Sequence, residues 1–385
     1  MKIRKCAAVC ICIVLILALL AGCASTVPAV GQANDKGLGN GWQKERSMEL
    51  KYAKNFSVDY YRGGYALISI SDGSRFLTVP EGMDTPAGID RDIVILKKPV
   101  DHIYLVATSA MCLFDALGSL GSIRMSGTDA GGWYVPNAKA AMENGDILYA
   151  GKYSKPDYEQ ILANNCKLAI ESTMINHSPD VKEKLEELGI PVLTEQSSYE
   201  KHPLARTEWI KLYGALLGKE DEATRIFDEQ VAYLDSVSGL ENTGKTVAFF
   251  YISSSGSAIT RKSGDYVTKM IELAGGNYIY HDLGDPDTAT STVTLEMEEF
   301  YATAKDADYI IYNSSIDGGV SNLQEFVAKN KLLADFKAVK SGHVWCTGKN
   351  LFQETTQLGL MISDIHQMLV SGDGLTKLNF MYKLQ

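Results

Sequence analysis

The chain has few cysteines, few histidines and no surplus of positive charge. Four of its seven cysteines fall within the first 23 residues, and the remaining three are Cys112, Cys166 and Cys346. An odd number of widely spaced cysteines is neither a disulfide framework nor a metal-binding pattern, so we expect three free, buried thiols. The six histidines are dispersed, which disfavours a site for a bare metal ion.

Negative charge dominates the chain. The 47 Asp and Glu residues outnumber the 37 Lys and Arg residues, and the net charge is −10. The first 22 residues hold three positive side chains and no acid, so the remainder carries a net charge of −13. Phosphates would repel such a protein, and we expect no nucleic-acid partner. Beyond the N-terminus no apolar run approaches the roughly 20 residues that a membrane span needs.

Catalytic signatures are also missing. The sequence contains neither Gly-x-Ser-x-Gly nor His-Glu-x-x-His. Residues 239–246 match the phosphate-loop pattern Gly-x-x-x-x-Gly-Lys-Thr, but a helical pattern precedes them and a β-rich run follows. A phosphate loop needs the reverse order, so we interpret the match as chance in a linker turn. We therefore expect no catalytic residue, no cofactor and no metal site, and hence no enzyme.

The N-terminus has the features of an export signal. Positive residues precede an apolar run at 6–20, and Leu-Ala-Gly-Cys follows at 20–23. This end resembles the lipobox of bacterial lipoproteins, which implies diacylglycerol on the Cys23 sulfur and removal of residues 1–22. Two acyl chains suffice for stable anchoring, so we expect an exported protein held to the extracytoplasmic face of the cell membrane. An ordinary signal peptide or an N-terminal anchor helix is the alternative.

Small and polar residues without a period make up 23–46, which predicts a flexible tether. After it, short apolar runs alternate with helical patterns, which is typical of α/β units with mainly parallel sheets. Strands are predicted at 48–52, 56–61, 65–70, 76–79, 102–106, 168–170, 192–193, 246–251, 309–312 and 343–345, with a hairpin turn at 62–64. Helices are predicted at 157–164, 180–188, 266–274 and 297–304.

A helical pattern of some thirty residues starts at Thr207, and Gly214 and Gly218 lie within it. We predict two Rossmann-like α/β lobes, at 47–206 and 245–385, joined by a long helix in the linker 207–244. A ligand cleft then lies between the lobes. One large α/β domain with a long surface helix is the alternative.

Five short motifs follow one another in a fixed order. They are Pro-Asp-Tyr-Glu-Gln-Ile-Leu at 156–162, Leu-Glu-Glu-Leu-Gly-Ile-Pro-Val at 185–192, a helix ending in Leu-Leu-Gly at 207–218, Ala-Gly-Gly-Asn at 274–277, and a Met-Glu-Glu-Phe-Tyr helix leading to Asp-Tyr-Ile-Ile at 297–311. The chain resembles the solute-binding proteins of bacterial ABC importers, in the group that takes up iron-siderophores, haem and cobalamin. Tyr158 replaces the leucine of the family pattern, and Asn277 comes one place early.

The resemblance implies partners and roles. The expected partners are an ABC permease with its ATPase, and the protein is expected to be a monomer. In the family, one glutamate on each lobe pairs with arginines of the permease. By position, these two glutamates are Glu159 and Glu298 here. Glu296 and Glu299 compete for the second role. An acid in the first turn of a helix is also favoured by the helix dipole alone.

Ligand contacts are expected from loops at the carboxyl ends of strands. Amphipathic aromatic residues there suit a ligand with flat and polar surfaces, and Arg261 and Lys262 suit an anionic one. The candidates are Trp133, Tyr134, Lys152, Tyr153, Glu171, Met174, Tyr251, Arg261 and Lys262. An iron-siderophore or haem is expected. The competing hypotheses are cobalamin in the same fold, a bare metal ion, and a different class of protein, an exported envelope hydrolase.

Overall fold

The computed structural model describes residues 38, 39, 41–284, 291–372 and 374–385, which all belong to one compact unit. The signal, Cys23 and most of the expected tether lie outside the described residues. Within the described residues no helix is long and apolar enough to cross a membrane.

A five-stranded sheet, here called the N-terminal sheet, opens the described chain. Its strands, in spatial order, are β1 (Lys44–Ser47), β2 (Phe56–Tyr61), β3 (Tyr65–Ile70), β4 (Arg75–Val79) and β5 (Ile93–Lys97). The first four are antiparallel, and β5 runs parallel to β4. The predicted hairpin turn at 62–64 is confirmed, because Gly63 and Gly64 have φ of 94° and 83°. The predicted strand at 48–52 is wrong, since these residues form a loop.

The first-lobe sheet is parallel throughout, in the order β12-β11-β6-β7-β8. Its strands are β6 (Ile103–Leu105), β7 (Ile123–Ser126), β8 (Leu148–Tyr149), β11 (Leu168–Ser172) and β12 (Val192–Glu195). The helices between them are α2 (Thr108–Ala116), α3 (Pro136–Glu143), α4 (Tyr158–Ala163) and α5 (Pro179–Glu187), and β9 (Gly151–Lys152) pairs with β10 (Lys155–Pro156). The range 47–206 thus holds three sheets, namely the N-terminal sheet, the first-lobe sheet and the two-stranded β9–β10 sheet.

The second-lobe sheet has the order β16-β14-β13-β17-β18-β19, and β15 pairs with β13. Its strands are β13 (Thr246–Ile252), β14 (Ala258–Arg261), β15 (Asn277–Tyr278), β16 (Thr292–Leu295), β17 (Tyr309–Tyr312), β18 (Val344–Thr347) and β19 (Met381–Lys383). Its helices are α8 (Tyr266–Leu273), α9 (Met297–Ala304), α10 (Leu323–Lys329), α11 (Lys337–Lys340) and α12 (Leu358–Val370). The expected α/β class with two lobes is confirmed.

Short 3-10 turns complete the description. They are η1 (Leu120–Ser122), η2 (Ala130–Gly132), η3 (Thr173–His177), η4 (Ser197–Tyr199), η5 (Lys331–Asp335), η6 (Leu351–Gln353) and η7 (Thr355–Gln357).

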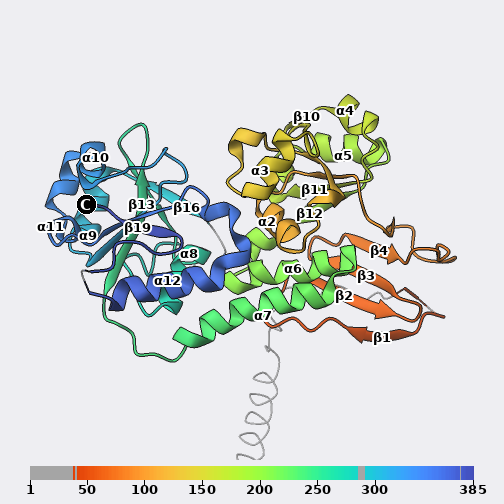
Figure 1. The fold of residues 1–385 in the computed structure, drawn as a ribbon, viewed down its shortest axis with the longest axis horizontal. Coiled ribbons are helices and arrows are strands. Elements are labelled where there is room, and N and C mark those ends of the chain that lie inside the picture. The colour runs from red at the N-terminus through yellow and green to blue at the C-terminus, as the bar shows by residue number, and fades with distance from the viewer. Residues whose placement is uncertain (1–37, 40, 285–290, 373) are drawn as a thin grey trace, which may run out of the picture. The chain divides into compact units, whose positions relative to one another are not determined.

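The linker is a pair of helices, which corrects the expectation of one long helix. α6 (Pro203–Leu217) ends at Gly218, whose φ of 73° lies in the left-handed region, and α7 (Glu220–Val237) then runs beside α6 (Figure 1). A Cβ at Gly214 would lie 2.7 Å from the Ala223 Cβ, so the two helices pack very closely. The periodic pattern continued across the break, whereas the chain reverses there.

The second lobe is fixed to this helix pair through α12. The Leu360 amide donates to the Gln230 side-chain oxygen over 3.2 Å. A Cβ at Gly359 would lie 2.1 Å from the Gln230 carbonyl oxygen, so only glycine permits this approach. One continuous hydrophobic core runs from the inner face of the N-terminal sheet through α6 and α7 into the second lobe.

Two buried carboxylates join the N-terminal sheet to α6. Glu208 is fully buried, and its oxygens accept hydrogen bonds from the backbone amides of Lys51, Tyr52 and Ala53 at 2.7–2.8 Å. The Lys211 ammonium donates to the same carboxylate over 3.0 Å. Backbone donors and one cation thus replace the water that a buried carboxylate loses.

Glu200 binds the next two backbone amides of the loop that follows β1. It accepts from the backbone amides of Lys54 and Asn55, and from the Trp209 indole over 3.1 Å. The amides of residues 51–55 are therefore all bound by two side chains that lie about 150 positions later in the sequence. These contacts explain why 48–52 is not a strand.

Replacing Glu208 with glutamine tests this junction. The amide keeps one acceptor and turns a donor toward backbone donors, so the free energy of unfolding should fall by about 2–4 kcal/mol in urea denaturation. Glu229→Gln is the control, because Glu229 is exposed and only approaches Arg225 at 3.6 Å. Equal stability of the two variants would contradict the structural role of Glu208.

Candidate ligand-binding cleft

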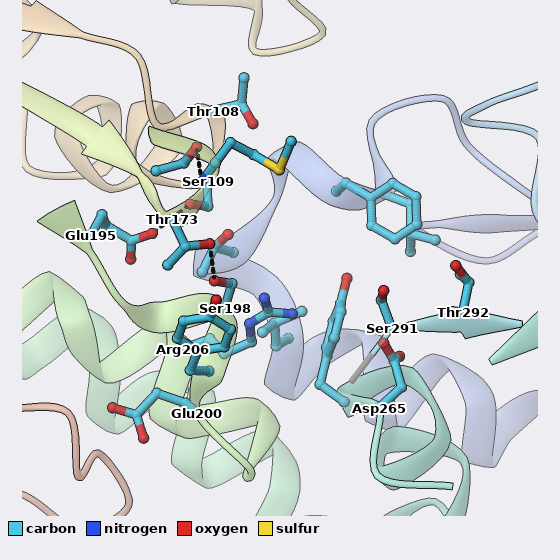
Figure 2. A pocket seen from close by; sticks show the side chains of 18 of the residues that line it. Thr108, Ser109, Thr173, Glu195, Ser198, Glu200, Arg206, Asp265, Ser291 and Thr292 are labelled. Atoms are coloured by element: carbon cyan, nitrogen blue, oxygen red, sulfur yellow. Dashed lines mark hydrogen bonds between the residues drawn. The ribbon is translucent and has the colours of Figure 1, made fainter. Parts of the chain in front are cut away.

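A cleft of about 670 Å³ is lined by residues of both lobes and of the start of α6. This volume lies within the range of small-molecule sites. In Figure 2, Glu195, Thr173 and Ser198 lie on one side, Ser291 and Thr292 lie on the other, and the Arg206 side chain extends between them. The expected cleft between two lobes is therefore present.

The first-lobe wall forms where β11 and β12 end. Ser172 caps η3 by accepting from the Met174 amide over 3.4 Å, and the Thr173 and Ser198 hydroxyls are hydrogen-bonded at 3.2 Å. These bonds join η3 to η4. The Met174 and Tyr199 side chains are left 45% and 54% exposed at the cleft, where a ligand can cover them.

Arg206 connects the walls. It lies in the first turn of α6, and its Nε donates to the Ser197 carbonyl over 3.1 Å. Its guanidinium carbon lies 3.9 Å from the centre of the Tyr266 ring, which belongs to α8 of the second lobe. This cation–π contact holds a positive charge at the cleft while its remaining donors stay available.

Arg261 supplies a second guanidinium from the end of β14. It is 7% exposed, forms a 3.2 Å ion pair with Asp265, and lies 5.0 Å from the Phe352 ring centre. Asp265 also caps α8 through the Val267 amide. Burial raises the pKa of Asp265, and the positive charge of Arg261 opposes that rise.

The acids at the cleft are occupied by internal bonds. Glu195 accepts from the Ser197 amide and the Ser109 hydroxyl at 3.0–3.1 Å, and Glu200 binds the 54–55 amides. Burial raises the pKa of both carboxyl groups, and their hydrogen bonds oppose the rise. Guanidinium donors on ring faces, with the carboxylates already bonded, suit a ligand that carries negative charge and flat surfaces.

Three of the predicted ligand residues line this cleft, namely Met174, Arg261 and Lys262. Trp133 does not, because it is buried with its indole donating to the Ser126 hydroxyl and the Thr128 carbonyl. Tyr134 is 42% exposed away from the cleft lining.

The remaining predicted residues also lie elsewhere. Lys152 and Tyr153 belong to the β9–β10 hairpin region, and Tyr251 lies on β13 against the main core. Glu171 is fully buried on β11. Their contact with a ligand stays a prediction that the cleft geometry does not support.

Sequence analysis missed Arg206, Tyr199, Tyr266 and Phe352. Arg206 directly precedes the helical pattern, and the predicted lobe boundary fell immediately after it. A cation in the first turn of a linker helix is unusual enough to have been a signal, because the helix dipole disfavours it there. Tyr266 and Phe352 gain their role only from the approach of distant elements.

Metal chemistry finds no support in the described part of the chain. No group of three or more His, Cys, Asp or Glu side chains there could hold a metal ion. Cys112, Cys166 and Cys346 are free and buried, as predicted. Glu159 and Glu298 are exposed in the first turns of α4 and α9, where a partner protein can reach them.

Two α/β lobes, a helical linker and a cationic, aromatic cleft between the lobes define a two-lobed ligand-binding protein. A family model described as periplasmic binding protein matches residues 124–351, more than half of the chain. The chain therefore belongs to the periplasmic binding protein family. This family consists of binding proteins, so the expectation that the chain is not an enzyme is confirmed.

Similar proteins extend the comparison. An uncharacterised lipoprotein of Methanocaldococcus jannaschii is 25% identical, over 94% of this chain and 90% of its own length. The periplasmic haem-binding protein RhuT from Roseiflexus sp. RS-1 superposes with a TM-score of 0.55 at 17% identity, over 70% of this chain and 97% of its own. The petrobactin-binding protein YclQ of Bacillus subtilis does so at 0.55 and 14% identity, over 70% and 92%.

Glu171 provides a test of the buried groups behind the cleft. Neither of its oxygens has a hydrogen-bond partner within the described residues, and burial raises its pKa to about 8. The folded protein then holds a proton that the unfolded chain releases above its ordinary pKa. Stability should therefore fall as pH rises from about 4.5 to 8 and level off above 8, by a few kcal/mol at most.

Glu171→Gln removes this titration. We expect the stability difference between the variant and the wild type to grow in favour of the variant across that pH range in urea denaturation. A difference that is independent of pH would mean that Glu171 is ionised in the folded protein.

Proposed function

We propose that this protein captures an iron chelate, a ferric siderophore or haem, in the cleft and delivers it to an ABC permease. The observation that carries the proposal is the pair of guanidinium groups, Arg206 and Arg261, held over aromatic rings at one cleft. Carboxylate, catecholate and propionate groups are the natural partners of such donors.

Ring surfaces at the cleft support the same ligand class. Tyr199, Tyr266 and Phe352 line it together with Met174, so a flat or aromatic chelate can pack against them. The fold shared with a haem-binding and a petrobactin-binding protein is consistent with either chemistry. Cobalamin, bound by the same fold, is the second candidate, because a corrin ring also needs flat apolar contacts.

Hydrolysis and the capture of a bare metal ion both lose support. An envelope hydrolase conflicts with the family, and no histidine lines the described cleft to act as a base for its serines. A bare metal ion lacks a ligand cluster among the described side chains.

Delivery needs a docking surface and an anchor. Glu159 and Glu298 are exposed on different lobes, which fits one ion pair per lobe with a permease. Lipid on Cys23 and the 23–46 tether would keep the protein near its permease and raise its effective concentration there. The lipoprotein name of a relative matched along most of this chain supports such an anchor.

Titration of residues 24–385 with haem, cyanocobalamin and several ferric siderophores tests ligand capture. We expect at least one iron chelate to change the tryptophan fluorescence, because the Trp209 indole is bonded to Glu200 at the cleft. No response to any of them would contradict the iron-chelate proposal, and a response to cyanocobalamin alone would favour a corrinoid.

Variants place the binding in the cleft. Arg206→Gln should weaken the binding of the responding chelate about 10-fold or more, since a hydrogen bond to a charged group contributes about 1.5–3 kcal/mol. Arg225→Gln is the matched control, because Arg225 is exposed on α7 and pairs with Glu222 outside the cleft. Equal loss in both variants would place the ligand elsewhere.

Charge reversal tests docking separately. The double variant Glu159→Lys with Glu298→Lys should abolish uptake of the chelate by cells and leave its affinity for the purified protein unchanged. Glu183→Lys with Glu241→Lys changes the net charge equally at exposed positions and serves as control. Normal uptake by cells that carry the first double variant would mean that neither Glu159 nor Glu298 is needed for docking to the permease.

A further inference from the structure

One side chain of the second lobe is bonded to the backbone of the first. Gln353, in η6, accepts from the Tyr134 amide over 2.7 Å and donates to the Gly132 carbonyl over 2.8 Å. Gln353 lies 219 residues after Tyr134 and 221 residues after Gly132 in the sequence. A glutamine amide suits this place because it presents one acceptor and one donor side by side, complementary to the peptide groups that flank Trp133.

The first-lobe half of this contact is rigid. Asp129 caps the turn by accepting from the Gly132 amide over 3.0 Å. A Cβ at Gly132 would lie 2.7 Å from the Thr128 methyl group, so the turn is tight. The buried Trp133 indole, bonded to Ser126 and Thr128, fixes the peptide groups on either side of it. Trp133 therefore contributes to a contact between lobes.

The second-lobe half belongs to the cleft wall. Leu351 and Phe352, the two other residues of η6, both line the cleft, and the Phe352 ring lies beneath Arg261. The Asn350 side-chain amide donates to a Glu354 carboxylate oxygen over 3.0 Å and closes the turn around η6. Any movement of Gln353 relative to Gly132 therefore moves the wall that carries Phe352.

The Gln353 contact differs from the other junctions between the lobes. At the base, the buried Thr207 hydroxyl donates to the Thr355 carbonyl over 2.8 Å, and α12 packs closely on α7. Gln353 is only half-buried, and its two hydrogen bonds lie near the protein surface rather than in the hydrophobic core. Half-exposed hydrogen bonds open more readily than buried packing does.

We propose that Gln353 is a positioning residue that latches the two lobes at the cleft wall and sets the width of the cleft. With the latch formed, Phe352 and Arg261 stay opposite η3 and η4. With the latch broken, the base remains packed and the lobes separate at the cleft. The latch does not depend on which ligand the cleft takes.

Distance measurement between spin labels tests the latch without any ligand. Labels are placed at Glu183→Cys on α5 and Lys340→Cys on α11, both exposed, in a protein of residues 24–385, which lacks the four N-terminal cysteines. The three native cysteines of the described chain are buried and remain unlabelled. Gln353→Leu should shift or broaden the distance distribution toward longer distances relative to the labelled wild type.

Two further variants separate a latch from a merely structural residue. Gln357→Leu makes the same substitution four positions later, where the side chain does not cap the following helix α12, and should leave the distribution unchanged. Gln353→Glu keeps the acceptor for Tyr134 but loses the donor for Gly132, so it should give an intermediate distribution. A general loss of stability would lower the melting temperature, but it would not place the distance distributions in the order wild type, Gln353→Glu, Gln353→Leu.

The outcomes are distinct. A distribution for Gln353→Leu that matches the wild type would overturn the latch, as would equal broadening in Gln357→Leu. Neither result bears on ligand capture, because no ligand is present in the measurement.

Discussion

The structure depends on two buried carboxylates, Glu200 and Glu208, and on the five backbone amides at 51–55 that they bind. A buried charge is tolerated only when it is well bonded, so this loop and α6 must form together. The junction attaches the N-terminal sheet to the helix whose first turn carries Arg206. That sheet ends at Lys97, before the family match begins at residue 124.

Rigid helices set how the cleft can work. α6, α7 and α12 pack so closely that Gly214 and Gly359 leave no room for a side chain. The base of the two lobes is therefore fixed, and any change of width is confined to the opposite side, where hydrogen bonds rather than core packing connect the walls. Arg206 lies at the fixed base and reaches across to Tyr266, so its charge stays in place as the walls move.

Local patterns predicted much of the fold and only part of the cleft. The turn at 62–64, the strands β2, β3 and β17 and the helix α9 follow from turn chemistry and periodicity, which depend on neighbouring residues. The predicted strand at 48–52 is wrong because backbone amides in this segment are bound by an acidic side chain far along the sequence. The prediction of a single linker helix is wrong because the apolar periodicity continues across Gly218, although the backbone reverses direction at this residue. Arg261 was predicted as a basic residue at a strand end and lines the cleft, whereas Trp133 and Tyr134 lie outside the cleft lining, where the backbone on either side of Trp133 contacts Gln353 of the other lobe.

The central claim is that a metal chelate lies between the two lobes against Arg206 and Arg261. The most direct test is X-ray diffraction from crystals of the complex at the absorption edge of the bound metal. The account predicts one anomalous peak inside the cleft, surrounded by chelate density that contacts both guanidinium groups and the Tyr199 side chain. A peak outside the cleft, or one bound directly by protein carboxylates without an organic chelate, would contradict it.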